Sequence, residues 1–346
     1  MRYLCLTFDV EPDIARIGGG FRGIEKGIPA LLEIFDKVEE KTGKKIAATW
    51  FITHDYWCKV DKLYSEIVKK LNQRDDEIGL HVHWGKKNRY FYNQEFQREL
   101  LAEGTYALRD KGYAVTSFRG GGLHLDEFTL KILEELGYLV DSSILPGLKI
   151  ANPETNFCVN HHHCIMQEPF YINYTNHCMP GESNIIECPL TTTRFFSIAF
   201  PPYRIEGVPF RLQIRRENGR QTGLAHSKDT PEESLRLMRQ ILSRKLKNQP
   251  QIIVLTFHPW EFFEGNENAS SMNDIPLHYL NNIKKWLVEL ARLENIKFST
   301  LEKACEIWRE ENKKQPVNQR WLITVSTHDI RFVGSALRAY IKRHRR

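Results

Sequence analysis

Strand-like and helix-like segments alternate along most of the chain, and this alternation limits the fold more than any other feature. Apolar runs of strand length occur at residues 3–8, 46–52, 78–83, 115–118 and 252–257. Helical periodicity follows these runs; the first such segment carries Leu31, Leu32, Phe35 and Val38 on one face and is predicted to end at Gly43. Repeated strand–helix units predict a parallel sheet covered by helices.

A closed or nearly closed barrel accounts best for the number of units, and a doubly wound open sheet is the alternative. We therefore expect an α/β fold, a distorted (β/α) TIM-like barrel of seven strands, over residues 1–312. Residues 145–181 lack periodicity and are interpreted as a long loop insertion over the active-site face. Residues 313–346 are expected to form a basic, helical C-terminal extension.

The net charge of +6 is concentrated at the end of the chain. Residues 331–346, "RFVGSALRAYIKRHRR", contain six lysines and arginines and no acid, so the rest of the chain is neutral overall. A neutral main body gives no support for a nucleic-acid partner. The apolar stripe of this extension suggests peripheral contact with an anionic membrane, although a helix packed on the barrel is the favoured interpretation.

Cysteine use and the apolar runs predict a cytoplasmic protein. Seven cysteines, an odd number in a long chain, argue against a disulfide framework. The acidic "FDVEPD" begins at residue 8, where a secretory signal would have its apolar region. The longest apolar runs have strand length, which excludes a transmembrane helix.

Two pairs of ionisable side chains, each spaced i, i+2, end two of the predicted strands. "LTFDVE" ends in Asp9 and Glu11, and "IGLHVHW" contains His81 and His83. Strand alternation puts the members of each pair on one side, and the carboxyl ends of parallel strands form the active-site face. Two imidazoles and a carboxylate are a usual set for a zinc-like divalent ion that keeps a position open for water.

Two more groups end other strands: Arg119 follows residues 115–118, and His258 follows "IIVLTF". A second carboxylate beside the ion would act as general base on the water, and a separate histidine as general acid. Each group alone has an ordinary structural explanation, such as a cap, an ion pair or a packed histidine. Their shared position at strand ends favours a hydrolase site.

An ordered set of motifs resembles the polysaccharide deacetylase family, carbohydrate esterase family four. The motifs are "LTFDVEPD", "AATWFITHDY", "DDEIGLHVHW", "SFRGGG" with "ELGYLVDSS", "SNIIECPLT" and "LTFHPWEF". The resemblance spans roughly residues 3–300. It implies a distorted barrel and a divalent metal, commonly zinc. It also implies that Asp9 is the catalytic base, His81 the first metal histidine, Arg119 the residue that orients the base, and His258 the catalytic acid.

The two metal-binding motifs depart from the family pattern. The family usually has adjacent aspartates, whereas one residue separates Asp9 from Glu11 here, and we assign Glu11 as the metal ligand. The family's histidines usually lie four residues apart, but Gly85 occupies that position. Either His83 takes the place of the missing histidine, or the metal takes a ligand from elsewhere.

The third departure concerns the substrate. Three glycines at 120–122 replace the proline and aromatic residue that usually follow the arginine, which predicts an open, backbone-lined wall with Gly121 in contact with substrate. Trp84 and Trp260 each stand beside a catalytic candidate and are predicted to stack on a sugar face, with a purely core role as the alternative. The stretch "CVNHHHC" at 158–164 matches no standard zinc spacing, so we interpret it as polar loop lining rather than a second metal site.

The resemblance implies a metal-dependent hydrolase that removes acetyl groups from an N-acetylated or O-acetylated carbohydrate, in glycan or cell-surface polysaccharide metabolism. In this hypothesis an ion held by Glu11, His81 and His83 activates a water, Asp9 takes its proton, and His258 protonates the leaving group. Two alternatives stay open: a hydrolase of a small non-sugar amide, and a catalytically inactive carbohydrate-binding relative.

Overall fold

The computed structural model describes the greater part of the chain. It covers residues 1–13, 19–53, 61–84, 93–146, 148–152, 157–161, 164, 166–191, 199–200, 203–204, 214–215, 221–222, 231–243, 250–263, 275 and 277–312. The predicted basic extension at 313–346 lies outside these residues, and so does its proposed membrane contact. In the part of the chain that the structure describes, no helix is long and apolar enough to cross a membrane.

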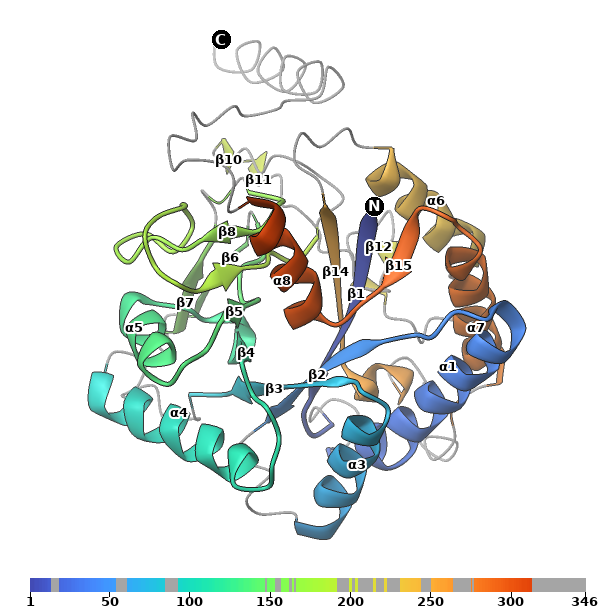
Figure 1. Ribbon diagram of the computed structural model, residues 1–346, viewed down its shortest axis with the longest axis horizontal. Helices are drawn as coiled ribbons and strands as arrows, with labels where there is room; N and C mark the ends of the chain where they lie inside the picture. Colours follow the sequence, from blue (N-terminus) through green and yellow to red (C-terminus); the bar gives the residue numbers. More distant parts are fainter. Residues whose placement is uncertain are drawn as a thin grey trace, which may run out of the picture.

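In the described part of the chain, nine strands form a curled sheet at the centre of the molecule (Figure 1). Its path runs through β14 (Gln251–Phe257), β1 (Arg2–Val10), β2 (Ala48–Thr53), β3 (Glu77–Val82), β4 (Ser117–Gly120), β5 (Val140–Asp141), β9 (Ile186–Glu187) and β8 (Phe170–Tyr171). Strand β15 (Ile296–Phe298) pairs with the first residues of β1. All pairs are parallel except β8 with β9, so seven parallel strands follow one another from β14 to β9. The predicted distorted α/β barrel is confirmed as a curled, partly open sheet.

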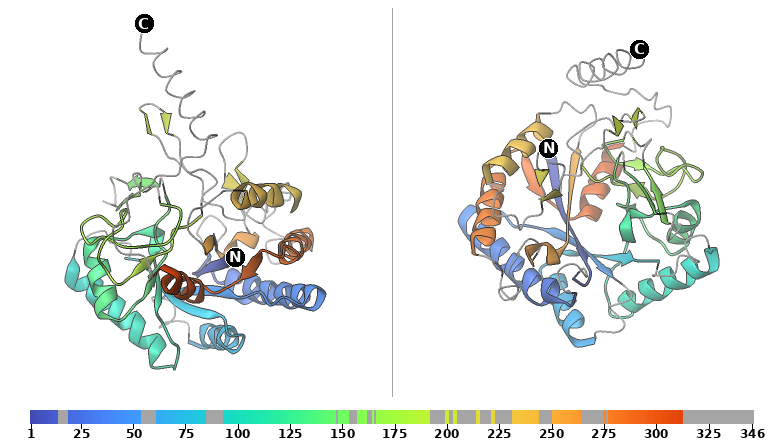
Figure 2. Two further views of the ribbon diagram at one scale, coloured as in Figure 1. Left: turned by 45° about the horizontal axis from the view of Figure 1, so that its top comes forward. Right: turned by 180° about the vertical axis from the view of Figure 1, so that it is seen from behind.

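Helices surround the outside of this sheet, as both views in Figure 2 show. They are α1 (Ile28–Thr42), α3 (Asp61–Gln73), α4 (Gln94–Arg109), α5 (Glu127–Glu135), α6 (Pro231–Leu242) and α7 (Leu277–Ala291). Local sequence sets several of their ends. Gly43 ends α1 in the left-handed conformation, with φ of 68°. The Asp126 side chain accepts a hydrogen bond from the Thr129 N–H at 2.8 Å and so caps the first turn of α5.

The two faces of β1 pack into different apolar cores. Leu4, Leu6 and Phe8 belong to the larger core between the sheet and the outer helices. Tyr3 and Cys5 belong to a smaller core inside the curl, which helix α8 (Leu301–Asn312) completes. The inner face of the sheet therefore has a packed floor at the end where the strands begin.

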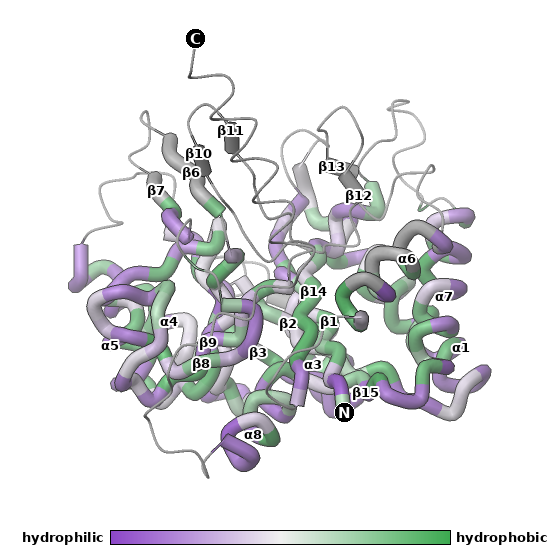
Figure 3. The backbone as a smooth tube through the Cα atoms, turned by 90° about the horizontal axis from the view of Figure 1, so that it is seen from above, coloured by the Kyte–Doolittle hydropathy of each residue, from purple (hydrophilic) through white to green (hydrophobic). Residues whose placement is uncertain are grey.

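Short strands cover the opposite end of the molecule. The predicted insertion at 145–181 contains a hairpin of β6 (Lys149–Asn152) and β7 (Phe157–Asn160). Two more pairs follow: β10 (Ala199–Phe200) with β11 (Tyr203–Arg204), and β12 (Ile214–Arg215) with β13 (Gln221–Thr222). Figure 3 places all three pairs on the side away from the N-terminus and α8. The insertion is thus less irregular than its sequence predicts, because strands of two to four residues are too short to give a periodic signal.

Candidate active site

The six side chains predicted from the strand ends lie together at one end of the curled sheet. Strands β14, β1, β2, β3 and β4 are consecutive neighbours in it. The register pairs His81 with Arg119 across β3 and β4, and Phe8 with Phe257 across β1 and β14. The ionisable residues that follow these positions therefore reach the same edge of the sheet.

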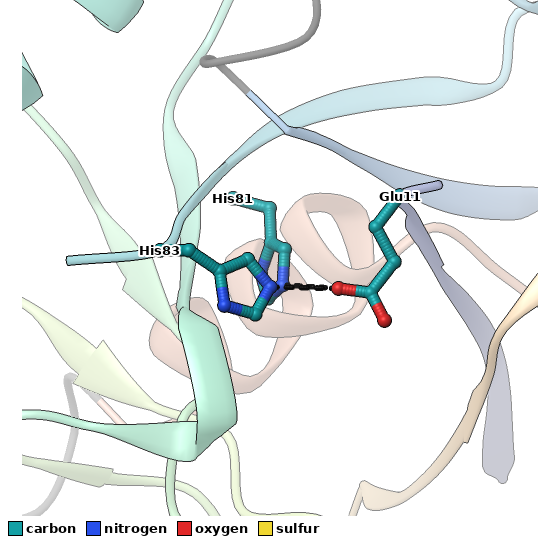
Figure 4. A group of neighbouring side chains, drawn as sticks. All are labelled: Glu11, His81 and His83. Carbon is teal, nitrogen blue, oxygen red and sulfur yellow. Dashed lines mark hydrogen bonds and ion pairs between the residues drawn. The ribbon is translucent and has the colours of Figure 1, made fainter. Parts of the chain in front are cut away.

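Glu11, His81 and His83 form a group that fits a divalent ion (Figure 4). One ligand atom from each lies within 4.8 Å of the others. Glu11 Oε2 is 2.7 Å from His83 Nε2 and 3.7 Å from His81 Nε2. Two imidazoles and one carboxylate are the donor set of an open zinc site. Among the described residues, no other group of three or more His, Cys, Asp or Glu side chains brings its possible ligand atoms this close together.

The neighbours of this group orient His81 and keep Glu11 ionised. His81 Nδ1 is 2.8 Å from the Arg119 carbonyl oxygen and so donates its hydrogen there, which leaves the lone pair of Nε2 directed to Glu11. Burial raises the pKa of Glu11, but the neighbouring histidines outweigh burial and hold this pKa well below its ordinary value. Burial lowers the pKa of His83, but the hydrogen bond to Glu11 and the nearby carboxylates outweigh burial and raise this pKa, so a divalent ion would take the place of the proton between His83 and Glu11.

Arg119 fixes Asp9 in a buried position. Its Nη1 donates to Asp9 Oδ1 at 2.8 Å, to Thr7 Oγ1 at 2.8 Å and to Thr256 Oγ1 at 3.0 Å. Its Nε and Nη2 donate to the Ser142 carbonyl and hydroxyl oxygens at 2.9 and 3.0 Å. Burial raises the pKa of Asp9, but the Arg119 charge and nearby histidines outweigh it, so the pKa is lowered. Asp9 is therefore an ionised carboxylate with its second oxygen directed into the site.

His258 faces both acids, and a residue that the sequence analysis missed holds it there. Its Nε2 lies 3.6 Å from Asp9 Oδ2 and 3.4 Å from Glu11 Oε1. Its Nδ1 is 3.1 Å from Oε1 of Glu261, a fully buried residue of the turn η4 (Pro259–Phe263). Burial lowers the pKa of His258, but the surrounding carboxylates outweigh it and the pKa is raised. The only sequence signal for Glu261 is an acid three residues after the histidine in "HPWE".

The three predicted substrate contacts are all buried. Trp84 is 1% exposed and Trp260 5% exposed, so neither ring presents a face to solvent, and sugar stacking stays a prediction for both. Gly121 lies under His83: a Cβ on Gly121 would stand 2.7 Å from His83 Nδ1. The missing side chain at 121 thus leaves the space that His83 occupies, and substrate contact by Gly121 also stays a prediction.

The stretch at 158–164 is described only in part. His161 is buried, and its Nδ1 accepts a hydrogen bond from the Leu145 N–H at 3.2 Å. Cys164 is buried and free of any disulfide. The side chains of Cys158, His162 and His163 lie outside the described residues. The described part adds no second group with three convergent metal ligands.

Comparisons with known proteins find similarity in structure alone. No protein-family model matches the chain, and no curated protein matches it. A candidate polysaccharide deacetylase from Mycobacterium smegmatis superposes with a TM-score of 0.55 at 18% identity, over 91% of this chain and 92% of that one. A candidate glycoside hydrolase/deacetylase from Parabacteroides distasonis gives 0.57 at 16% identity, over 89% and 71%. The 4-alpha-glucanotransferase of Thermococcus litoralis gives 0.52 at 11% identity, over 88% and 40%. The chain has the fold of the polysaccharide deacetylases, and the glucanotransferase shows that this fold alone does not decide the chemistry.

Proposed function

We propose that this chain, which has the fold of the polysaccharide deacetylases, is a metal-dependent hydrolase that removes acetyl groups from an acetylated carbohydrate. The observation that carries the proposal is the meeting of a three-ligand group with an ionised carboxylate and a histidine of raised pKa at one end of the sheet. Pairs of groups whose surroundings favour opposite protonation states mark a base and an acid.

The residues fit a divalent ion, and zinc suits the donor set of Glu11, His81 and His83 best. When bound, such an ion makes a water more acidic and polarises the acetyl carbonyl. The remaining steps belong to the protein. Asp9 Oδ2 is directed into the site and accepts the proton of the attacking water, while Arg119 keeps the Asp9 carboxylate in place.

His258 completes the reaction as general acid. With Nδ1 on Glu261, its Nε2 is free to donate a proton to the departing amine or hydroxyl. This Nε2 lies 3.6 Å from Asp9 Oδ2, so the proposed acid and the proposed base are neighbours in the site. Retention of base, acid and ligands together favours an enzyme over an inactive carbohydrate-binding relative.

A small non-sugar amide is the second candidate substrate. The burial of Trp84 and Trp260 favours it, since carbohydrate sites commonly offer exposed aromatic faces. The carbohydrate proposal rests on the family resemblance and the shared fold. A role in glycan metabolism and a cytoplasmic location are parts of the same proposal.

The decisive experiment combines metal analysis with an acetate-release assay. We expect one zinc per purified chain and acetate release from N-acetylhexosamine oligosaccharides. The variant His81→Ala should lose both. Zinc without acetate release from any acetylated sugar would favour the amide hydrolase, and wild-type protein that binds no divalent ion would refute the proposal. Full metal content and activity in His81→Ala would show that the site is assigned wrongly.

A further inference from the structure

Trp260 joins the metal-ligand group to the proposed acid. We infer that it is a positioning residue that assigns the two oxygens of Glu11 to different partners. Its Nε1 donates to Glu11 Oε1 at 3.1 Å, while Glu11 Oε2 lies 2.7 Å from His83 Nε2. The inference rests on the proposed function, because it takes Glu11 as a ligand.

The hydrogen bond selects one orientation of the Glu11 carboxylate. With Oε1 held by the indole, Oε2 is the oxygen that faces His81 and His83. An outer partner of this kind orients a ligand before the ion arrives, which reduces the cost of ordering it on binding. Without the indole N–H, Oε1 has His258 Nε2 as its neighbour at 3.4 Å. The carboxylate would then turn toward the acid.

The same indole also sets the plane of the His258 ring. The two rings are stacked, with centroids 4.7 Å apart and planes inclined by 29°. Glu261 contacts the edge of the ring at Nδ1 of His258. The imidazole is therefore fixed by one contact on its face and one on its edge, and its Nε2 keeps its direction toward Asp9.

Trp260 itself is held by close backbone packing. The short helix η2 (Gly23–Gly27) lies directly on η4: a Cβ at Gly23 would stand 2.5 Å from the Trp260 N, and one at Gly27 would stand 2.6 Å from the Pro259 O. Asp13, two residues after Glu11, accepts the Gly23 N–H at 2.9 Å and ties η2 to the end of β1. The indole is thus held in place as an internal support for the site.

The test measures Zn²⁺ affinity by competition with a chromophoric chelator. Trp260→Phe keeps an aromatic ring over His258 and removes the N–H, and we expect it to raise the Kd for Zn²⁺ about 10- to 100-fold, the usual effect of losing an outer partner of a ligand. Trp286→Phe is the matched control, since Trp286 is also buried and its Nε1 has no hydrogen-bond partner among the described residues. It should bind Zn²⁺ as the wild type does.

A double-mutant cycle separates positioning from general damage. In a Glu11→Ala background, Trp260→Phe should cause no further loss of affinity, because the oxygen that it orients is gone. Equal loss in both backgrounds, or wild-type affinity in Trp260→Phe, would overturn the inference while leaving the proposed function standing. Wild-type protein that binds no Zn²⁺ would overturn the proposed function and this inference with it. If Trp260→Phe does not fold, Trp260→Tyr replaces it in the same cycle.

Discussion

The buried carboxyl of Asp76 should make the protein less stable as the pH rises toward neutrality. Asp76 directly precedes β3, and its two oxygens accept hydrogen bonds from the Ala48 N–H at 3.2 Å and Trp50 Nε1 at 3.0 Å. Burial raises its pKa to about 6, although Trp50 and Arg74 favour the ionised form. Asp76 lies at the opposite end of β3 from His81, so a change there leaves the site intact.

The direction of the effect follows from proton binding. The ordinary pKa of the side chain is 3.8, so between roughly pH 4 and 6 the folded state keeps a proton that the unfolded chain has released. The contribution of Asp76 to the free energy of unfolding is therefore greatest below about pH 4, and it is lost as the pH rises through about 6. A shift of about two pKa units corresponds to about 3 kcal/mol, of which about 2 kcal/mol is lost between pH 4.5 and 7.

Urea unfolding at pH 4.5 and pH 7 tests this reasoning with Asp76→Asn. The amide of the variant cannot ionise, so the variant lacks this contribution, while every other titrating group is shared and cancels in the comparison. The free energy of unfolding of the wild type should fall by about 2 kcal/mol more than that of the variant over this interval. Parallel pH dependences in the two proteins would refute the assignment of a proton to folded Asp76.

Three further predictions concern Glu261, Asp126 and Gly121. Glu261→Gln should shift the alkaline limb of the pH profile of kcat to lower pH. Burial lowers the pKa of His258, but the carboxylates around it outweigh burial, and the variant removes one of these carboxylates. An unshifted limb would contradict the assignment of His258 as the acid. Asp126→Asn should destabilise the protein by about 2 kcal/mol at pH 7 in urea unfolding, because burial raises the pKa of Asp126 but its hydrogen bonds outweigh burial and bring the pKa to about 2. That difference should disappear as the pH falls from 4 to 2, and a pH-independent difference would show that charge is not the cause. Gly121→Ala should weaken Zn²⁺ binding by about tenfold by displacing His83, and it should have a smaller effect in a His83→Ala background; the chelator competition assay measures both.

Features set by neighbouring residues could be predicted from the sequence. Helix α1 ends at Gly43 because a glycine readily takes the left-handed conformation. Helix α5 begins directly after Asp126 because the carboxylate of Asp126 accepts the N–H of the residue three positions later. Both features depend on residues close together in the sequence. The meeting of Asp9 and Glu11 with His81 and His83 could be predicted as well. It follows from strand alternation and from the rule that the carboxyl ends of parallel strands lie at one edge of the sheet.

Contacts between distant segments could not be predicted in this way. The Trp260 indole looked available for a sugar, but its N–H meets Glu11, a residue 249 positions away in the chain. Substrate contact by Gly121 stays a prediction, but its missing side chain also leaves the space into which His83 fits, because β3 and β4 lie side by side. For both Trp260 and Gly121 the sequence indicated a residue near the site, but tertiary packing decides which residue each one contacts.

The position of β1 has a consequence for how the protein is made. Arg2 pairs with Gln251 on one side and with Ile296 on the other, and the core inside the curl is completed by α8, which ends at Asn312. After β1 is synthesised, about three hundred further residues must follow before α8 covers its inner face. Pairings of such sequence separation are slow to form and leave apolar surface exposed in the meantime. We expect the nascent chain to bind chaperones that shield apolar segments, and release from them to depend on the arrival of α8.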